Sequence, residues 1–160
     1  MNSIKAKIDK SDYRDDWLFP NYHIDNIWFD EKLDELYPDN LYKGLIPTLL
    51  YGLINKEAEI VWKAILPNKG EVTMCPILMC PDDYDFSCTL IVAEIENYGY
   101  FIQWKRIGVD KQTKWFDDEI RYDIDWFSDF QSLNFEIDDY QRMVEDFKIQ
   151  YQLDKLKNNI

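Results

Sequence analysis

The chain has 160 residues, of which 46% are apolar and 16% aromatic, and its formal net charge is −13. This length and composition predict one acidic domain, residues 1–160, whose core is large enough to fold without a metal or a disulfide. The negative charge argues against nucleic acid and anionic membrane surfaces as partners, because like charges repel.

The first quarter of the chain predicts an irregular arm followed by a helix. Residues 1–24 are expected to form the arm, anchored to the core by Trp17, Leu18, Phe19 and Tyr22. A helix should follow, because Asp25 or Asn26 can cap the free amides of its first turn. Its apolar residues recur at helical spacing, and Pro38 would end it. They are Phe29, Leu33, Leu36 and Tyr37.

The middle of the chain predicts a second helix and then an antiparallel meander. The helix is expected over about residues 42–53, although Pro47 disfavours a helix interior unless the helix starts at that residue. In that case Leu49, Leu50 and Leu53 would form its inner face. Four strand candidates follow, and the third has two mostly apolar faces, which is typical of a central strand. These candidates are residues 58–66, 72–79, 87–96 and 100–107, with Asn97-Tyr98-Gly99 as a hairpin loop.

The last part of the chain predicts a fifth strand and a helix. Residues 120–126 alternate, with Ile120, Tyr122, Ile124 and Trp126 facing the core and Arg121, Asp123 and Asp125 facing water. The final helix would begin at a capping box formed by Asp138 and Gln141, with a frayed tail after Asp154. Its apolar residues are Tyr140, Met143, Val144, Phe147 and Tyr151. This order predicts an α+β fold, in which N-terminal helices and a C-terminal helix pack on an antiparallel meander of four to five strands.

All three cysteines lie in residues 75–88, CPILMCPDDYDFSC. Their C-x4-C and C-x7-C spacing does not fit structural zinc, and a fourth ligand would have to be His23 or a carboxylate. The neighbouring aspartates would raise the pKa of a thiol, which disfavours a nucleophilic cysteine. We therefore interpret the stretch as a strand, a turn and a strand with three buried or half-buried thiols. No metal and no cofactor are expected.

Two features predict a cytoplasmic protein with reduced thiols. Three cysteines leave one unpaired, and the first 17 residues have no apolar core of the signal-peptide type. The longest apolar stretch, residues 45–54, is too short to span a bilayer. Reduced cysteines are the ordinary state in a cytoplasm.

Motifs of common enzyme classes are missing from the sequence. There is no glycine-rich phosphate loop, no G-x-S-x-G and no H-E-x-x-H. A calcium loop starting at Asp123 fails, because Ser128 stands where glycine belongs and Asn134 where the bidentate glutamate belongs. A pair among the 31 acidic residues could still support acid–base catalysis, as in glycosidases. We expect no enzyme, with a carboxylate-dependent hydrolase as the lowest alternative.

Residues 115–130, WFDDEIRYDIDWFSDF, interleave acidic and aromatic side chains, and we call them the acidic–aromatic strip. One interpretation is an edge strand with a solvated acidic face. The other is a binding surface, in which aromatics supply contact area and carboxylates steer a basic partner. The predicted partner-binding residues are Trp115, Asp117, Asp118, Glu119, Tyr122, Asp123, Asp125, Trp126 and Asp129, with Asp82, Asp83 and Asp85 as a neighbouring patch.

In general build the chain resembles the immunity proteins of bacterial polymorphic toxin systems. The resemblance rests on its small acidic character, the absence of a catalytic motif and the meander that includes CTLIVAEIENYGYFIQWKRIG, residues 88–108. It implies a protein that binds a toxin, often a nuclease, and blocks a basic cleft. We therefore expect a noncatalytic protein that neutralises a basic partner protein, such as a toxin domain. The alternative is a general interaction or regulatory domain without a toxin partner.

Overall fold

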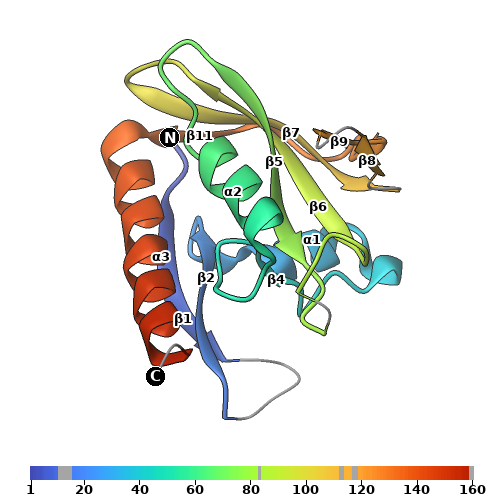
Figure 1. The fold of residues 1–160 in the computed structure, drawn as a ribbon. Helices are drawn as coiled ribbons and strands as arrows, with labels where there is room; N and C mark the ends of the chain where they lie inside the picture. Colours follow the sequence, from blue (N-terminus) through green and yellow to red (C-terminus); the bar gives the residue numbers. More distant parts are fainter. Residues whose placement is uncertain (11–15, 83, 112–113, 117–118, 159–160) are drawn as a thin grey trace.

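A computed structural model of the protein describes residues 1–10, 16–82, 84–111, 114–116 and 119–158 (Figure 1). The predicted α+β class is confirmed, because α-helices accompany antiparallel sheets and a long helix ends the chain. The sheets differ in detail from the single meander that the sequence predicts. In the described residues they have three, six and two strands.

The N-terminal segment is a sheet, so the prediction of an irregular arm is wrong. Strand β1 (Ile4–Lys10) pairs with β2 (Leu18–Ile24), and the short β3 (Ile27–Trp28) pairs with β2 on its other side. The segment is extended because Ile4, Ala6 and Ile8 alternate with polar residues, which suits a strand with one buried face. The anchoring role of Phe19 and Tyr22 is confirmed by their burial, whereas Leu18 is 66% exposed.

Helix α1 (Phe29–Leu36) confirms the first predicted helix but not its cap. Asp25 and Asn26 lie in the turn between β2 and β3, where both have positive φ, 51° and 67°. The helix instead begins after Trp28, which makes no side-chain capping hydrogen bond. Short polar residues adopt left-handed conformations readily, so the same residues that suit a cap also suit this turn.

The second predicted helix is wrong, and so is the first predicted strand. After a 3-10 turn, η1 (Pro38–Asn40), the chain forms the short strand β4 (Ile46–Pro47), and helix α2 (Asn55–Ala64) follows it. Leu49, Leu50 and Leu53 are buried as predicted, but in turns rather than in a helix. Helix α2 occupies most of the residues predicted as the first strand. A helix forms there because Ala58, Val61 and Ala64 recur every third residue and therefore share one buried face.

The six-stranded sheet contains the predicted meander. Strands β5 (Val72–Met79), β6 (Leu90–Asn97) and β7 (Phe101–Asp110) pair in sequence, with β4 beyond β5. Strands β10 (Ile124–Trp126) and β11 (Leu133–Glu136) both pair with β7. The central position of β6 is confirmed, with both faces buried over Leu90–Ala93, and Gly99 has the expected positive φ of 96°. The predicted fifth strand is divided between β10 and β9 (Glu119–Arg121), which pairs with β8 (Lys114–Phe116).

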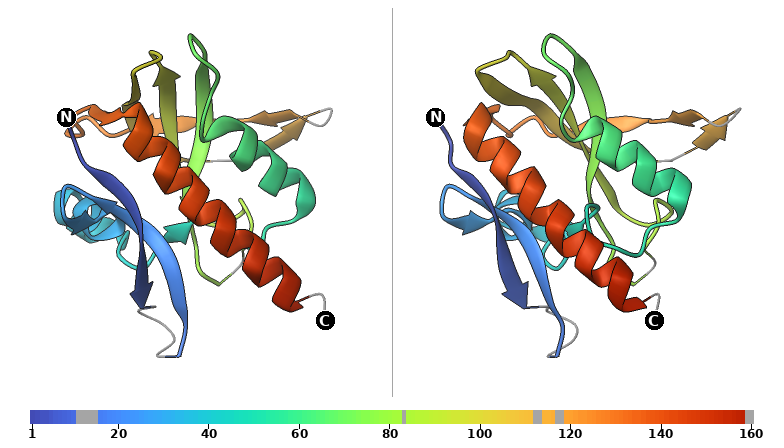
Figure 2. Two further views of the ribbon diagram at one scale, coloured as in Figure 1. Left: turned by 90° about the vertical axis from the view of Figure 1, so that its left-hand side faces the viewer. Right: turned by 60° about the vertical axis from the view of Figure 1, so that its left-hand side comes forward.

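Helix α3 (Ile137–Asn158) confirms the last predicted helix, with two corrections. It begins one residue before Asp138, which therefore lies in the first turn instead of capping it, and it continues beyond Asp154 to Asn158. It runs across the N-terminal sheet with α2 beside it (Figure 2). No helix in the described part of the chain is long and apolar enough to cross a membrane.

The core is organised around Trp104 of β7, which is fully buried. Its ring contacts four aromatic rings, each from a different element, with centroids 5.4 to 6.4 Å away. These rings are Tyr22 of β2, Phe29 of α1, Phe135 of β11 and Tyr140 of α3. Trp104 also donates a hydrogen bond from Nε1 to Tyr140 Oη at 3.1 Å. One residue thus joins the large sheet, the N-terminal sheet and two helices.

The prediction of three reduced thiols is wrong, because Cys80 and Cys88 form a disulfide. Pairing of β5 with β6 reaches Met79 and Leu90, so the residues just beyond these ends lie close together, with Cys80 and Cys88 Cα atoms 5.9 Å apart. Cys75 remains a free thiol in the core, and burial raises its pKa well above the ordinary value. The 75–88 stretch is otherwise the predicted strand and turn.

Replacing both Cys80 and Cys88 with alanine should lower the free energy of unfolding. The bond joins residues eight positions apart, and restricting a loop of that size in the unfolded chain is worth about 2.6 kcal/mol. Urea denaturation of the oxidised protein and the double variant measures the difference. A thiol reductant should destabilise the parent chain equally and leave the double variant unchanged. Equal sensitivity of both proteins to the reductant would contradict the prediction.

Candidate partner-binding surface

The described part of the acidic–aromatic strip runs through β9 and β10. Trp115 lies in β8 and Glu119 in β9, whereas Asp117, Asp118 and Asp83 lie outside the described residues. The chain leaves the β8–β9 pair at Arg121 and joins the large sheet at Ile124, where β10 pairs with β7. The strip therefore divides between the two-stranded β8–β9 sheet and the edge of the six-stranded sheet, rather than forming one continuous strand.

The alternation predicted for residues 120–126 is confirmed. Ile120, Tyr122, Ile124 and Trp126 are half-buried, whereas Arg121, Asp123 and Asp125 are exposed. Asp110 at the end of β7 holds the link between β9 and β10 in place, because its Oδ1 accepts a hydrogen bond from Asp123 N at 3.0 Å. The Asp123 side chain forms an exposed ion pair with Lys111 at 3.7 Å. Carboxylates thus face solvent on one side of this segment and rings face the protein on the other.

The Trp126 ring stacks against an arginine side chain of its own chain. The guanidinium carbon of Arg106 lies 3.9 Å from the centre of the Trp126 ring, a distance at which a cation is attracted to the ring face. Arg106 Nη2 also pairs with Glu94 Oε2 at 3.2 Å. The half-buried Trp126 ring is therefore a surface on which a planar cation stacks.

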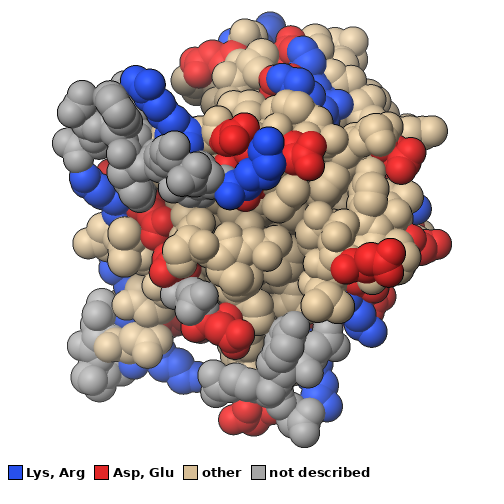
Figure 3. Space-filling view, turned by 90° about the vertical axis from the view of Figure 1, so that its right-hand side faces the viewer, with Lys and Arg blue, Asp and Glu red and all other residues tan. Residues whose placement is uncertain are grey.

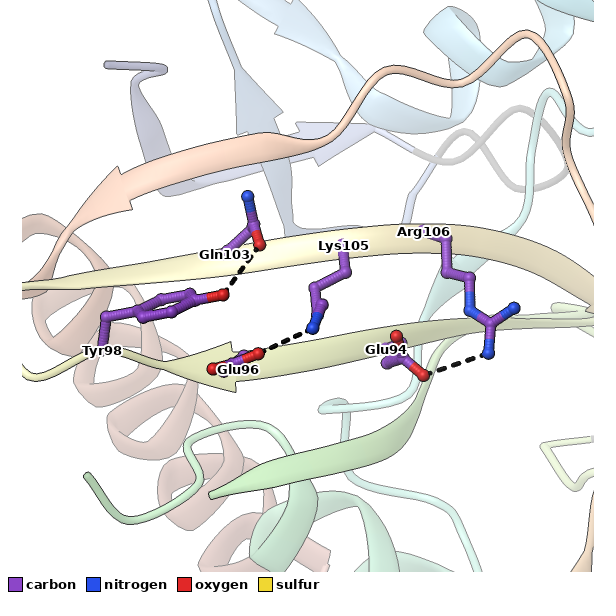
Figure 4. Close-up of polar contacts among 6 residues, drawn as sticks. All are labelled: Glu94, Glu96, Tyr98, Gln103, Lys105 and Arg106. Atoms are coloured by element: carbon purple, nitrogen blue, oxygen red, sulfur yellow. Dashed lines mark hydrogen bonds and ion pairs between the residues drawn. The ribbon is translucent and has the colours of Figure 1, made fainter. Parts of the chain in front are cut away.

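Beyond Arg106, the outer face of β6 and β7 carries a row of paired polar side chains (Figure 4). Lys105 Nζ lies 2.7 Å from Glu96 Oε1, and this hydrogen bond raises the pKa of Lys105 and lowers that of Glu96. Lys105 is the extra residue of a β-bulge, since the pair Glu94–Arg106 is followed by Ile95–Trp104. The bulge turns Lys105 and Arg106 outward together, so each reaches a glutamate and the charges on this face are balanced locally.

An aromatic groove lies beside β10. Its cavity of about 370 Å³ is lined by Tyr37, Asn40, Tyr42, Val109, Asp125, Trp126, Phe127 and Ser128. Phe127 packs against Tyr37 and Tyr42, with ring centroids 4.7 and 5.6 Å apart. The negative charge of Asp125 acts on the groove, because it adds to burial and Tyr37 in raising the pKa of Tyr42. We call this cavity the β10 groove.

The predicted neighbouring patch lies on the disulfide loop between β5 and β6. Asp82 is exposed and Asp85 half-buried, with Asp85 Oδ1 accepting a hydrogen bond from Ser87 N at 2.9 Å. Buried Glu57 holds the loop, because its Oε2 accepts a hydrogen bond from Phe86 N at 3.0 Å. Burial raises the pKa of Tyr122, and the charges of Cys75, Asp110 and Glu57 raise it further. Glu57 of α2 thus anchors the loop.

Charges of both signs are interspersed on the side of the molecule that carries β8 and β9 in Figure 1. In the space-filling view, separate red and blue groups surround a broad tan area (Figure 3). The acidic residues that the structure describes on this face therefore form separate groups rather than one continuous negative surface. A partner recognised here would meet local carboxylates beside apolar and aromatic surface.

Sequence reasoning identified Trp126 and Asp125 but missed the groove that they line. Tyr37 and Tyr42 come from the segment after α1, and only the tertiary fold brings them to β10. Asp129 is exposed and lies next to the β10 groove, because its backbone N donates a hydrogen bond to Oη of the lining residue Tyr37 at 3.2 Å. Comparison with known proteins adds no relative: no family model, no curated protein and no solved structure matches this chain.

Proposed function

We propose that the protein is a noncatalytic binding domain that takes a basic partner protein at the β10 groove. The observation that carries this proposal is a cavity walled by aromatic rings with an exposed carboxylate, Asp125, among its lining residues. Ring faces attract cations, and a carboxylate pairs with the same cation, so an arginine or lysine side chain suits the site. The contact between Arg106 and Trp126 is an example of this chemistry within the chain.

In its finer form the proposal is an immunity protein that neutralises a cognate bacterial toxin. The net charge of −13 supports a cationic partner, because opposite charge accelerates encounter and orients the two surfaces. A toxin with a basic cleft would meet this requirement. A neighbouring gene for a large secreted protein with a toxin domain would support the toxin form. Its absence would favour a general interaction domain at the same groove.

The hydrolase alternative would need carboxyl groups free for chemistry. Asp30 and Glu57 are buried, and burial raises the pKa of both. Each, however, accepts a hydrogen bond from a backbone amide, Gly44 N for Asp30 and Phe86 N for Glu57. These contacts favour structural roles in which the carboxyls hold loops in place.

Reversing Asp123 and Asp125 to lysine should slow association with the partner without unfolding the domain. Both side chains are exposed, so the change replaces steering attraction with repulsion and removes only the long ion pair to Lys111. We expect the association rate constant to fall by roughly tenfold at physiological salt. The partner is first identified by affinity capture from the native cells with mass spectrometry, and surface plasmon resonance then gives the rates.

The matched control reverses Glu145 and Asp146, two exposed acids of α3, and changes the net charge by the same amount. It should reduce the rate much less, because charges near the contact dominate steering at physiological salt. An affinity and a salt dependence that are unchanged in the Asp123→Lys, Asp125→Lys variant would show that the strip is the wrong site.

A further inference from the structure

Strand β1 is the outer strand of the N-terminal sheet. It pairs with β2 over seven consecutive residues, Ile4–Ile24 to Lys10–Leu18, without a bulge. On its other side the sheet order ends in the described residues, and β11 meets the chain there just before β1, through an isolated bridge between Asn2 and Phe135. An edge strand presents backbone N–H and C=O groups to solvent, which makes it a template for another strand.

The end of this hairpin also exposes apolar surface. Ile8 is 54% exposed and shares a face of β1 with Ile4 and Ala6. Leu18, 66% exposed, lies on the same face because it pairs directly with Lys10. Large apolar side chains this exposed at a sheet edge are typical of surfaces that pair with another chain.

We propose that two copies of this chain dimerise by antiparallel pairing of their β1 strands, centred on Ile8. A two-fold axis places the same residues of the two copies opposite one another in reverse order. Ile8 then packs against Ile8 of the second copy. Lys7 meets Asp9 of the second copy, and Asp9 meets its Lys7. The interface is therefore self-complementary in both apolar contact and charge.

The charges select this register. Centring the pair on Lys7 would place Lys7 opposite Lys7, and like charges directly opposite are unfavourable. A register centred between Lys7 and Ile8 would place Lys7 of one copy opposite Ile8 of the other. It would bring the apolar face of one strand beside the polar face of the other. Lysine on an edge strand usually prevents pairing. In the single chain Lys7 lies over the Trp28 ring and Asp9 Oδ2 accepts a hydrogen bond from Asn21 Nδ2, so both side chains would turn toward the opposite charge of the second copy. The pairing is independent of the β10 groove, which lies on other elements.

Analytical ultracentrifugation of the full chain tests the dimer. The parent protein should show a concentration-dependent dimer, and Ile8→Lys should be monomeric because two lysines would face each other at the axis. Ile149→Lys, a change at a similarly exposed residue of α3, should leave the dimer intact. Melting temperatures of the variants check that the fold is kept. A parent chain that stays monomeric at its highest soluble concentration overturns the proposal.

A charge exchange tests the register itself. Lys7→Asp alone and Asp9→Lys alone each place like charges opposite one another twice, so each should weaken the homodimer by at least about tenfold. An equimolar mixture of the two variants restores both opposite-charge pairs and should form a heterodimer. Failure of the mixture to dimerise overturns this register. Slow amide exchange of β1 only in the presence of a different protein would identify a foreign strand and overturn the second copy as occupant.

Discussion

Replacing Trp104 with alanine should destabilise the domain more than any surface substitution, by about 3–5 kcal/mol. The side chain is fully buried, and its ring contacts rings from β2, α1, β11 and α3. Its loss leaves a cavity where four elements meet and removes the donor to Tyr140 Oη. The surrounding rings cannot close this cavity without moving whole elements, because each is fixed by its own strand or helix.

Urea denaturation followed by circular dichroism measures this effect without depending on tryptophan fluorescence. Trp126→Ala is the matched control, because it removes the same side chain from a half-buried position on β10. It should cost clearly less, since less apolar surface leaves the interior. Equal losses of unfolding free energy in the two variants would contradict the central role of Trp104.

The sequence predicts the centre of the large sheet well, because its signals are local. Strand β5 matches the prediction residue for residue, and β6 and β7 are displaced by up to three residues at their ends. Each is an apolar run bounded by turn residues, and Gly99 marks the hairpin with its positive φ. These signals need only neighbouring residues to be interpreted.

The failures lie where distant residues decide the local structure. Residues 42–53 have leucines at helical spacing, but Pro47 lies in β4, which pairs with β5 at Leu78. Thr48 secures the same segment, because its Oγ1 donates to Pro76 O at 2.7 Å. The buried polar contact outweighs helix propensity, and the helix forms after it as α2.

The candidate site also combines features that local sequence signals predict with features that depend on contacts between distant residues. Outward acids and inward rings over residues 120–126 follow from alternation, a local signal. The β10 groove does not, because Tyr37 and Tyr42 reach Trp126 only through the tertiary fold. Arg106, which stacks on Trp126, lies at a bulge in β7, and no residue pattern in the sequence predicts that bulge.

Lowering the pH from about 7 to about 4 should stabilise the domain through Asp30 by up to about 3 kcal/mol. Asp30 of α1 is only 4% exposed, and its oxygens accept hydrogen bonds from Gly44 N at 2.9 Å and Asn21 Nδ2 at 3.4 Å. Burial raises its pKa from the ordinary 3.8 to about 6, although the Gly44 hydrogen bond opposes the rise. The folded chain therefore takes up this proton at a higher pH than the unfolded chain, so stability increases as the pH falls through 6.

Asp30→Asn removes the titrating group and should flatten the dependence of unfolding free energy on pH over this range. Urea denaturation at several pH values measures the slope for both proteins, and the difference between them isolates Asp30 from the other carboxyls. Glu31→Gln is the control, because it removes one charge at the adjacent exposed position and should keep the slope of the parent chain. An Asp30→Asn variant that retains the full rise would show that this carboxyl is ionised in the folded protein as readily as in water, which its burial between α1, β2 and Gly44 argues against.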